Sequence, residues 1–215
     1  MLAIAIVTLG VGCGLEDPLR VQHVACGEDF ESCAGGGDCF ARCLCESASR
    51  ERCEAQCGAS TAPRVSDLDE SGWPASSAAF EEQVLSLTNE ARAQGGCCGA
   101  QGCFDASAPL TLEPALRTSA RAHALDMAQR DYFDHDTPEG LSPFDRMREA
   151  GYRGCALGEN IAAGQRAPQE VLESWLGSPG HCANMLQPGF RVLGVGYART
   201  DAGSLHDFWV QNFGG

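Results

Sequence analysis

Two stretches of the chain repeat apolar residues at the spacing of one helix face. The first stretch ends at Gly95-Gly96, a combination typical of a helix stop. The second follows Pro114, a residue that favours the first turn of a helix. This spacing predicts two helices, each with an apolar face. The apolar positions are Phe80, Val84, Leu87 and Ala91 in the first stretch, and Leu116, Ala120, Ala124 and Met127 in the second.

Shorter helices are predicted in the middle of the chain. Ser142-Pro143 is a helix start, and Gly151 ends that helix. Pro168 begins the next helix, whose apolar face includes Trp175. Ser178-Pro179 then ends this helix and caps the turn that follows.

Two apolar runs near the C-terminus predict β-strands, at residues 192–198 and 208–213. Asp201-Ala202-Gly203 lies between them and favours a hairpin connection. Because helices come first and a sheet comes last, the sequence favours an α+β fold.

The N-terminal segment has the features of an export signal. The apolar run at residues 2–11 is too short for a membrane-spanning helix, which needs about 20 such residues, but it suits the centre of a secretory signal. Residues 1–12 are therefore interpreted as signal-like, and no transmembrane helix is expected elsewhere. Cys13 follows small residues, as at bacterial lipoprotein cleavage sites, so it is a candidate lipid attachment site at the start of a tail over residues 13–25. Ordinary secretion, with Cys13 removed or paired, is the alternative.

A small cysteine-rich module follows at residues 26–57. It holds seven cysteines and few large apolar residues, so burial alone cannot stabilise it. Disulfides are the favoured explanation, and a metal knuckle is the alternative. Residues 58–78 are rich in Gly, Ser, Ala and Pro and are interpreted as a linker, which leaves residues 79–215 as the globular domain.

Composition narrows the compartment and the function. The net charge is −14, from 15 basic and 29 acidic side chains, and every basic residue is Arg. An acidic excess argues against nucleic-acid binding, and the absence of Lys excludes a lysine Schiff base. Thirteen cysteines in 215 residues are typical of an oxidising compartment. Cys97 and Cys98 are expected to have different partners, because adjacent cysteines rarely meet disulfide geometry.

Three residues outside the predicted apolar faces are candidates for chemistry. His135 is flanked by Asp134 and Asp136, which favour its protonated form or orient its ring. His181 lies in the first turn of a short helix, where the helix dipole favours the neutral, metal-binding imidazole. Glu159 lies between a Gly-rich turn and an Ala-rich stretch, where a carboxylate needs a partner. His123, by contrast, is expected to be a core residue, because it falls on the apolar helix face.

The region from Phe80 to Gly215 resembles the CAP superfamily, which includes cysteine-rich secretory proteins, antigen 5 and pathogenesis-related proteins, and it is most similar to the bacterial branch. The resemblance implies a three-layer α-β-α sandwich (the CAP or SCP domain), here preceded by the disulfide-rich module. The strings that carry it occur in the family's order: LTNEARAQG (87–95), HALDMAQRDYFDHDTPEG (123–140), GYRGCALGENIAAG (151–164), SWLGSPGHCANML (174–186), LGVGYA (193–198) and FWVQNFG (208–214).

The resemblance also implies a cleft lined by His135, Glu159 and His181. Some family members hold a divalent metal, often zinc, between the cleft histidines. These two are therefore the candidate metal ligands, with Glu159 as a third ligand or as the partner that orients a histidine. No cofactor is expected to be required. The family positions of the supporting cleft residues are occupied by Asn160, Ser178 and Asn184.

Two departures from the family pattern bear on this cleft. Ser178 stands where eukaryotic members carry a second Glu, which weakens an acid–base pair, and Glu173 lies on the same helix at a different position. Cys182 stands where many bacterial members carry Arg, and it is expected to form a disulfide there.

Three functions are compatible with these features. The favoured one is a non-enzymatic, exported or surface-anchored binding protein whose ligand is a lipid, glycan or peptide. The first alternative is a metal-assisted hydrolase, protease-like, with His135 and His181 as ligands and Glu159 as base. The second alternative is a structural or adhesion protein of the cell envelope with a vestigial cleft. Nucleic acid is not an expected partner.

Overall fold

The computed structural model describes residues 3–8, 65, 68–154 and 157–215. The described residues fall into two compact units, and the smaller one contributes only residues 136–142. In that segment the Gly140 N–H donates to the Thr137 carbonyl oxygen at 2.7 Å, which closes a tight turn. Cys13 and the cysteine-rich module at residues 26–57 lie outside the described residues, so the predictions on them stay predictions.

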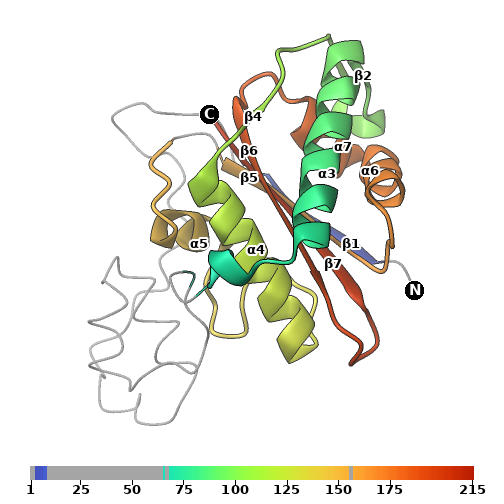
Figure 1. The fold of residues 1–215 in the computed structure, drawn as a ribbon. Coiled ribbons are helices and arrows are strands. Elements are labelled where there is room, and N and C mark those ends of the chain that lie inside the picture. Colours follow the sequence, from blue (N-terminus) through green and yellow to red (C-terminus); the bar gives the residue numbers. More distant parts are fainter. Residues whose placement is uncertain (1–2, 9–64, 66–67, 155–156) are drawn as a thin grey trace, which may run out of the picture. The chain divides into compact units, whose positions relative to one another are not determined.

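A five-stranded sheet forms the centre of the larger unit (Figure 1). Strand β7 (Asp207–Gly214) lies between β5 (Leu157–Ala163) and β6 (Val192–Arg199) and is antiparallel to both. The predicted C-terminal hairpin is therefore confirmed. Strand β1 (Ala3–Thr8) pairs antiparallel with β5, and β4 (Thr111–Leu112) pairs parallel with β6. Residues 3–8 of the segment interpreted as signal-like thus form an edge strand of this sheet.

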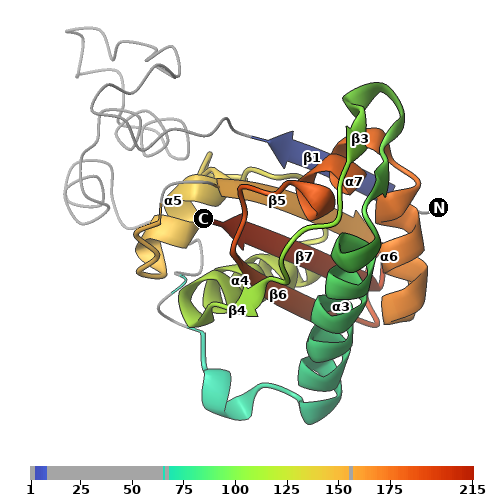
Figure 2. The ribbon, with the colours of Figure 1, turned by 90° about the horizontal axis from the view of Figure 1, so that it is seen from above.

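Helices cover both faces of the sheet, which confirms the three-layer α-β-α architecture (Figure 2). Helices α4 (Pro114–Arg130) and α5 (Pro143–Glu149) lie on one face. Helices α3 (Ala75–Gln94), α6 (Pro168–Leu176) and α7 (Pro179–Leu186) lie on the other. Among the described residues, no helix has the length and apolar character needed to cross a membrane.

Alternating residues of β7 supply the two halves of the core. Phe208 and Val210 pack with Ala124 of α4 in one cluster of buried residues. Trp209 packs with Trp175 of α6 in the other cluster. Because successive side chains of a strand point to opposite faces, each residue of the central strands belongs to one helix layer or the other.

Two glycines allow α4 to lie directly against β6. A Cβ atom at Gly194 would come within 2.1 Å of the Arg117 backbone nitrogen, and one at Gly196 would come within 2.3 Å of the Ala120 carbonyl carbon. No side chain fits into such spaces without displacing backbone. The buried apolar face predicted for α4 is confirmed. The close approach also brings the Ala120 N–H of α4 within hydrogen-bond distance of Asn212 in β7.

Helix α3 is confirmed, but its buried face is more polar than the apolar spacing suggests. It begins at Ala75, inside the stretch interpreted as linker, and its buried residues are Ser77, Glu81, Val84, Thr88 and Arg92. Phe80 and Leu87 are only partly buried. Arg92 replaces apolar packing with hydrogen bonds, since its guanidinium donates to the carbonyl oxygens of Ala108, Met185, Gln187 and Phe190 at 2.8–3.3 Å.

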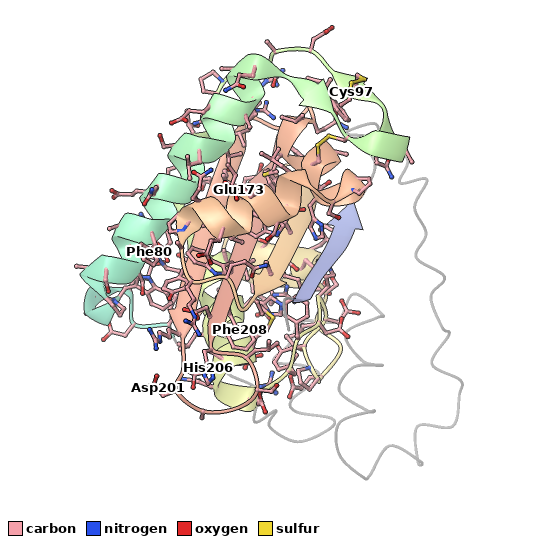
Figure 3. The ribbon with its side chains drawn as sticks, turned by 90° about the vertical axis from the view of Figure 1, so that its right-hand side faces the viewer. Phe80, Cys97, Glu173, Asp201, His206 and Phe208 are labelled. Carbon is pink, nitrogen blue, oxygen red and sulfur yellow. A yellow bond between two sulfur atoms is a disulfide. The ribbon has the colours of Figure 1, made fainter. Side chains whose placement is uncertain are left out.

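Two disulfides connect the segment after α3. Cys97 pairs with Cys103 across the short strands β2 (Gly96–Cys97) and β3 (Cys103–Phe104), and Cys98 pairs with Cys182 of α7 (Figure 3). The prediction that the adjacent cysteines have different partners is confirmed. The expected disulfide of Cys182 is confirmed as well, and it ties the helix that carries His181 to the end of α3.

Candidate functional site

The centre of the candidate site is a hydrogen bond between His135 and Glu159. Glu159 lies in the middle of β5 with no exposed surface, and His135, which follows α4, is 7% exposed. The Nδ1–H of His135 donates to Oε1 of Glu159 at 2.8 Å. The ring is therefore oriented by a carboxylate 24 residues away in sequence rather than by its flanking acids.

The other carboxylate oxygen of Glu159 is also held. Arg146 of α5 donates from Nη2 to Oε2 at 2.8 Å, and its Nη1 donates to the backbone oxygen of His135 at 2.7 Å. Asn212 of β7 donates from Nδ2 to the same Oε2 at 2.9 Å, while its Oδ1 accepts from the Ala120 N–H at 3.2 Å. Glu159 thus accepts hydrogen bonds from three side chains, one of them cationic.

These contacts fix the charge of Glu159. Complete burial raises the pKa of this carboxyl, but the charge of Arg146 and the hydrogen bond from His135 outweigh burial, so its pKa lies below the usual value. Glu159 is therefore ionised, and its carboxylate holds the side chains of His135 and Arg146 in place. A carboxylate stabilised in this way is a weak proton acceptor.

The opposite ring nitrogen of His135 lacks such a partner. Nε2 is buried and has no hydrogen-bond partner among the residues that the structure describes. When the ring is neutral and its proton lies on Nδ1 toward Glu159, Nε2 carries a lone pair. This atom is able to accept a hydrogen bond or to coordinate a metal ion.

His123 holds the backbone next to His135. It is fully buried in α4, as predicted, and its Nε2–H donates to the Asp134 carbonyl oxygen at 3.0 Å. Burial, reinforced by the charge of Arg146, lowers the pKa of His123 to about 3. His123 therefore stays neutral and fixes the residue that precedes His135.

His181 belongs to a second group of polar residues, around Asn160. Its Nδ1 is 2.8 Å from Oγ of Ser178, and its backbone oxygen accepts from Nδ2 of Asn160 at 3.2 Å. Asn184 of α7 donates to Oδ1 of Asn160 at 2.9 Å and to the Glu159 backbone oxygen at 3.3 Å. Asn160 also donates to Gln211 at 3.0 Å. The expected supporting residues Asn160, Ser178 and Asn184 are thus all joined to His181 or β5.

The three candidate metal ligands do not form a three-ligand site. Both oxygens of Glu159 are occupied by side-chain donors, as described above. In the part of the chain that the structure describes, no group of three or more His, Cys, Asp or Glu side chains could hold a metal ion. The arrangement instead gives Glu159 the role of orienting His135, the other role expected for it.

Other candidates lie outside this arrangement. Glu173 is exposed on α6, where it accepts from Gln169 at 3.0 Å, and His206 is exposed before β7 (Figure 3). Arg146 and Asn212 are the site residues that sequence reasoning missed. The sequence indicated that the Glu159 carboxylate needs a partner, but it did not indicate which residue that partner is.

Comparison with known proteins places most of the chain in one family. The family described as "CAP: Cysteine-rich secretory protein family" matches residues 85–213. The uncharacterized protein YkwD of Bacillus subtilis (strain 168) is 41% identical over 140 residues, which are 65% of this chain and 49% of that protein. The uncharacterized membrane protein YlbC of the same organism is 30% identical over 141 residues, which are 66% of this chain and 36% of that protein. The chain thus spans about half or less of these relatives.

Solved structures agree with the fold. An extracellular protein containing a SCP domain from Bacillus anthracis str. Ames is 30% identical with a TM-score of 0.54, over 64% of this chain and 41% of that chain. An outer surface protein of Borrelia burgdorferi is 18% identical with a TM-score of 0.50, over 64% of this chain and 90% of that chain. The second likeness concerns the fold alone.

Proposed function

Because the chain belongs to the CAP family of cysteine-rich secretory proteins, we propose that it is an exported protein that binds a ligand without transforming it, and that His135 is its main ligand-contacting residue. The observation that carries this proposal is the buried Nε2 of His135, which has no hydrogen-bond partner among the described residues. An unpaired buried polar atom is unfavourable, so a ligand that supplies the missing donor gains affinity.

The chemistry of Nε2 restricts the ligand. A lone pair needs an O–H or N–H donor, which glycan hydroxyls and peptide amides supply and the hydrocarbon part of a lipid does not. The ring is oriented before binding by Glu159, and the backbone of His135 is held by Arg146. Such preorganisation lowers the entropy lost on binding. The ligand is therefore a hydroxyl- or amide-bearing molecule.

The state of Glu159 favours binding over hydrolysis. The hydrolase alternative needs this carboxylate as a base, or as one of three metal ligands. Its oxygens accept from His135, Arg146 and Asn212, and its pKa is lowered. Protonation of Glu159 by water would remove the charge that pairs with Arg146 and weaken these hydrogen bonds. The residues as arranged do not fit a three-ligand metal centre, so no step through a metal is derived.

Export is supported by two observations. The described part of the chain contains the disulfides Cys97–Cys103 and Cys98–Cys182, which form in oxidising compartments. One structural relative is described as an extracellular protein. We further propose that Cys13 carries the lipid anchor of a surface-attached form, in which cleavage before Cys13 removes residues 1–12 and with them strand β1.

Glycan and peptide arrays probed with the full chain test the proposed function. His135→Ala is the test variant, and His206→Ala, which removes an exposed histidine, is the matched control. We expect a defined set of glycans or peptides to be retained by the wild type and by His206→Ala, and to be lost with His135→Ala. Retention that is equal in all three proteins would support the alternative of a vestigial site.

A further inference from the structure

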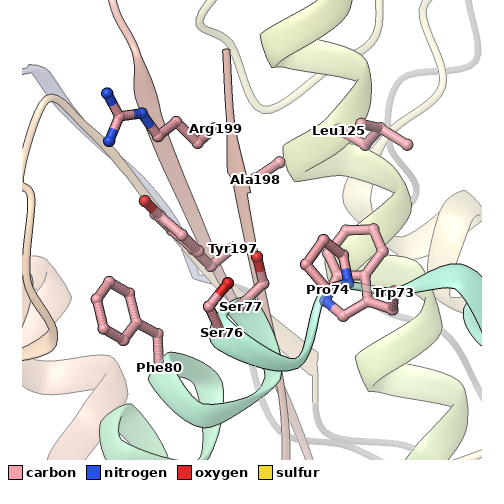
Figure 4. Close-up of a pocket in the computed structure, with 9 residues that line it drawn as sticks. All are labelled: Trp73, Pro74, Ser76, Ser77, Phe80, Leu125, Tyr197, Ala198 and Arg199. Carbon is pink, nitrogen blue, oxygen red and sulfur yellow. The ribbon is translucent and has the colours of Figure 1, made fainter.

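A pocket of about 400 Å³ lies beside the open edge of β6, and it does not include His135 or His181. Its volume is within the range of small-molecule sites. Its lining residues come from the segment before α3, the first turns of α3, α4 and the end of β6 (Figure 4). They are Trp73, Pro74, Ser76, Ser77, Phe80, Leu125, Tyr197, Ala198 and Arg199.

Aromatic rings form the walls of this pocket. The ring centroids of Phe80 and Tyr197 are 5.3 Å apart, and Tyr197 lies 4.1 Å from Trp209 behind it. Trp73 is fixed from two sides, because its Nε1–H donates to Glu81 at 2.8 Å and the Arg121 guanidinium lies 5.0 Å above its ring. The walls are thus held in place and suit a flat aromatic body.

The first turn of α3 contributes unused hydrogen-bond donors. Pro74 at the N-cap makes no side-chain hydrogen bond, so the first N–H groups of this 20-residue helix lack a capping acceptor. Ser77 is only 7% exposed, and it lines the pocket. In Figure 4 the hydroxyls of Ser76 and Ser77 point toward the space between α3 and β6. The uncapped N–H groups and the positive dipole end of this helix N-terminus favour an anionic group.

The charged side chains around the pocket also favour an anionic ligand. Glu81 is neutralised by Arg121, whose guanidinium donates to both of its oxygens at 2.6–3.2 Å. Asp207 accepts from the Tyr197 hydroxyl at 2.6 Å. The Arg199 side chain at the rim is 64% exposed and makes one loose contact with Asp201, at 3.5 Å. A cation at the rim and a helix N-terminus inside disfavour a cationic ligand.

We propose that this pocket is a second binding site, which takes a small aromatic carboxylate. The ring stacks between Trp73 on one side and Phe80 and Tyr197 on the other. The carboxylate accepts from Ser77, the first turn of α3 and Arg199. The site is independent of the function proposed for His135, because the two share no residue.

Three probes of nearly equal size test this proposal by calorimetry with the full chain at pH 7: indole-3-acetate, the neutral indole-3-acetamide and the cationic tryptamine. We expect saturable one-to-one binding of indole-3-acetate, about tenfold tighter than binding of either analogue, as one or two charge-assisted hydrogen bonds supply. Absence of saturable binding, or equal affinity for the three probes, would overturn the proposal.

Variants separate this pocket from other surfaces. Ser77→Ala removes one hydroxyl from the pocket lining. It should weaken indole-3-acetate binding about three- to tenfold, the effect of about one hydrogen bond. Arg199→Gln should weaken it to a similar extent, and Ser76→Trp, which fills the pocket, should abolish it. Arg166→Gln, which changes an exposed arginine outside the pocket, is the control. Unchanged binding in the three pocket variants would overturn the proposal.

Discussion

Glu159 and Asn160 are neighbours in β5, and their side chains serve opposite faces of the sheet. Glu159 faces α4 and α5, where it meets His135 and Arg146. Asn160 faces α7, where it donates to the His181 backbone oxygen. His135 therefore contacts β5 on one face of the sheet, through the Glu159 side chain, and His181 contacts it on the other face, through the Asn160 side chain. Because Glu159 points toward His135 and not toward the face that contacts His181, the site is centred on His135.

The charge of Arg146 is expected to be essential to the fold around this site. Arg146→Met leaves the buried Glu159 carboxylate without a counterion, which should lower the free energy of unfolding by about 3 kcal/mol. Urea denaturation at pH 7 measures this loss, with Arg166→Met as the exposed control. The double variant Arg146→Met/Glu159→Gln should recover part of the stability, because it removes both charges. A loss in Arg146→Met no larger than in the control would contradict the ion pair.

The buried His123 should make the protein sensitive to mild acid. Its pKa is lowered from 6.5 to about 3, so between these values the unfolded chain binds a proton that the folded chain does not. The stability it contributes is present above pH 6.5 and is lost as the pH falls, with a slope of up to about 1.4 kcal/mol per pH unit. Urea midpoints from pH 7 to pH 4 should show this slope in the wild type and a shallower one in His123→Gln, whose amide is able to keep the bond to Asp134. Parallel curves for the two proteins would be the contrary result.

The two disulfides are expected to differ in their effect on stability. Cys98–Cys182 closes a loop with a sequence separation of 84 residues, and Cys97–Cys103 closes one of 6. Chain entropy then predicts losses of about 4 kcal/mol for Cys98→Ser/Cys182→Ser and about 2 kcal/mol for Cys97→Ser/Cys103→Ser. Thermal unfolding of the two double variants compares them. Equal losses would show that loop length does not determine the contribution.

Zinc binding separates the present account from a three-ligand metal site. Because the Glu159 oxygens are held by other side chains, zinc titrated into the metal-free full chain should show no tight one-to-one site that depends on these histidines, so the wild type and His135→Ala/His181→Ala should differ at most in weak binding. Calorimetry makes this comparison directly. A tight one-to-one site that the double variant lacks would instead mean that the histidines converge on a metal.

The fold was largely predictable where burial follows a simple period. The apolar stripe of α4 that includes Leu116 and Met127 is fully buried, and the C-terminal hairpin lies where alternation placed it. Strand β5 was not predicted, because Gly158, Glu159 and Asn160 are typical of a loop. The two polar side chains are buried in a strand because each has hydrogen-bond partners on its own face of the sheet. The apolar spacing of α3 likewise did not reveal its polar buried face.

Within the site, sequence reasoning found the residues but not their roles. His135 and Glu159 were identified from their flanking residues and from the family strings. Their hydrogen bond connects segments that no periodicity relates. Arg146 could not be recognised, because an arginine in a short helix is usually exposed and its role depends on the packing of α5 near β5. The contact between Arg146 and Glu159 depends on how α5 packs against β5, so the sequence around either residue does not predict it.

The most direct test of the account is the protonation pattern of the His135 ring. Long-range ¹H–¹⁵N correlation spectra of the labelled full chain at pH 7 distinguish the two ring nitrogens, and His135→Gln identifies the signals among those of the five histidines. The account predicts a protonated Nδ1, held by Glu159, and an unprotonated Nε2. A ring protonated at Nε2 with a bare Nδ1 would contradict it, because Glu159 would then not be the partner that orients His135.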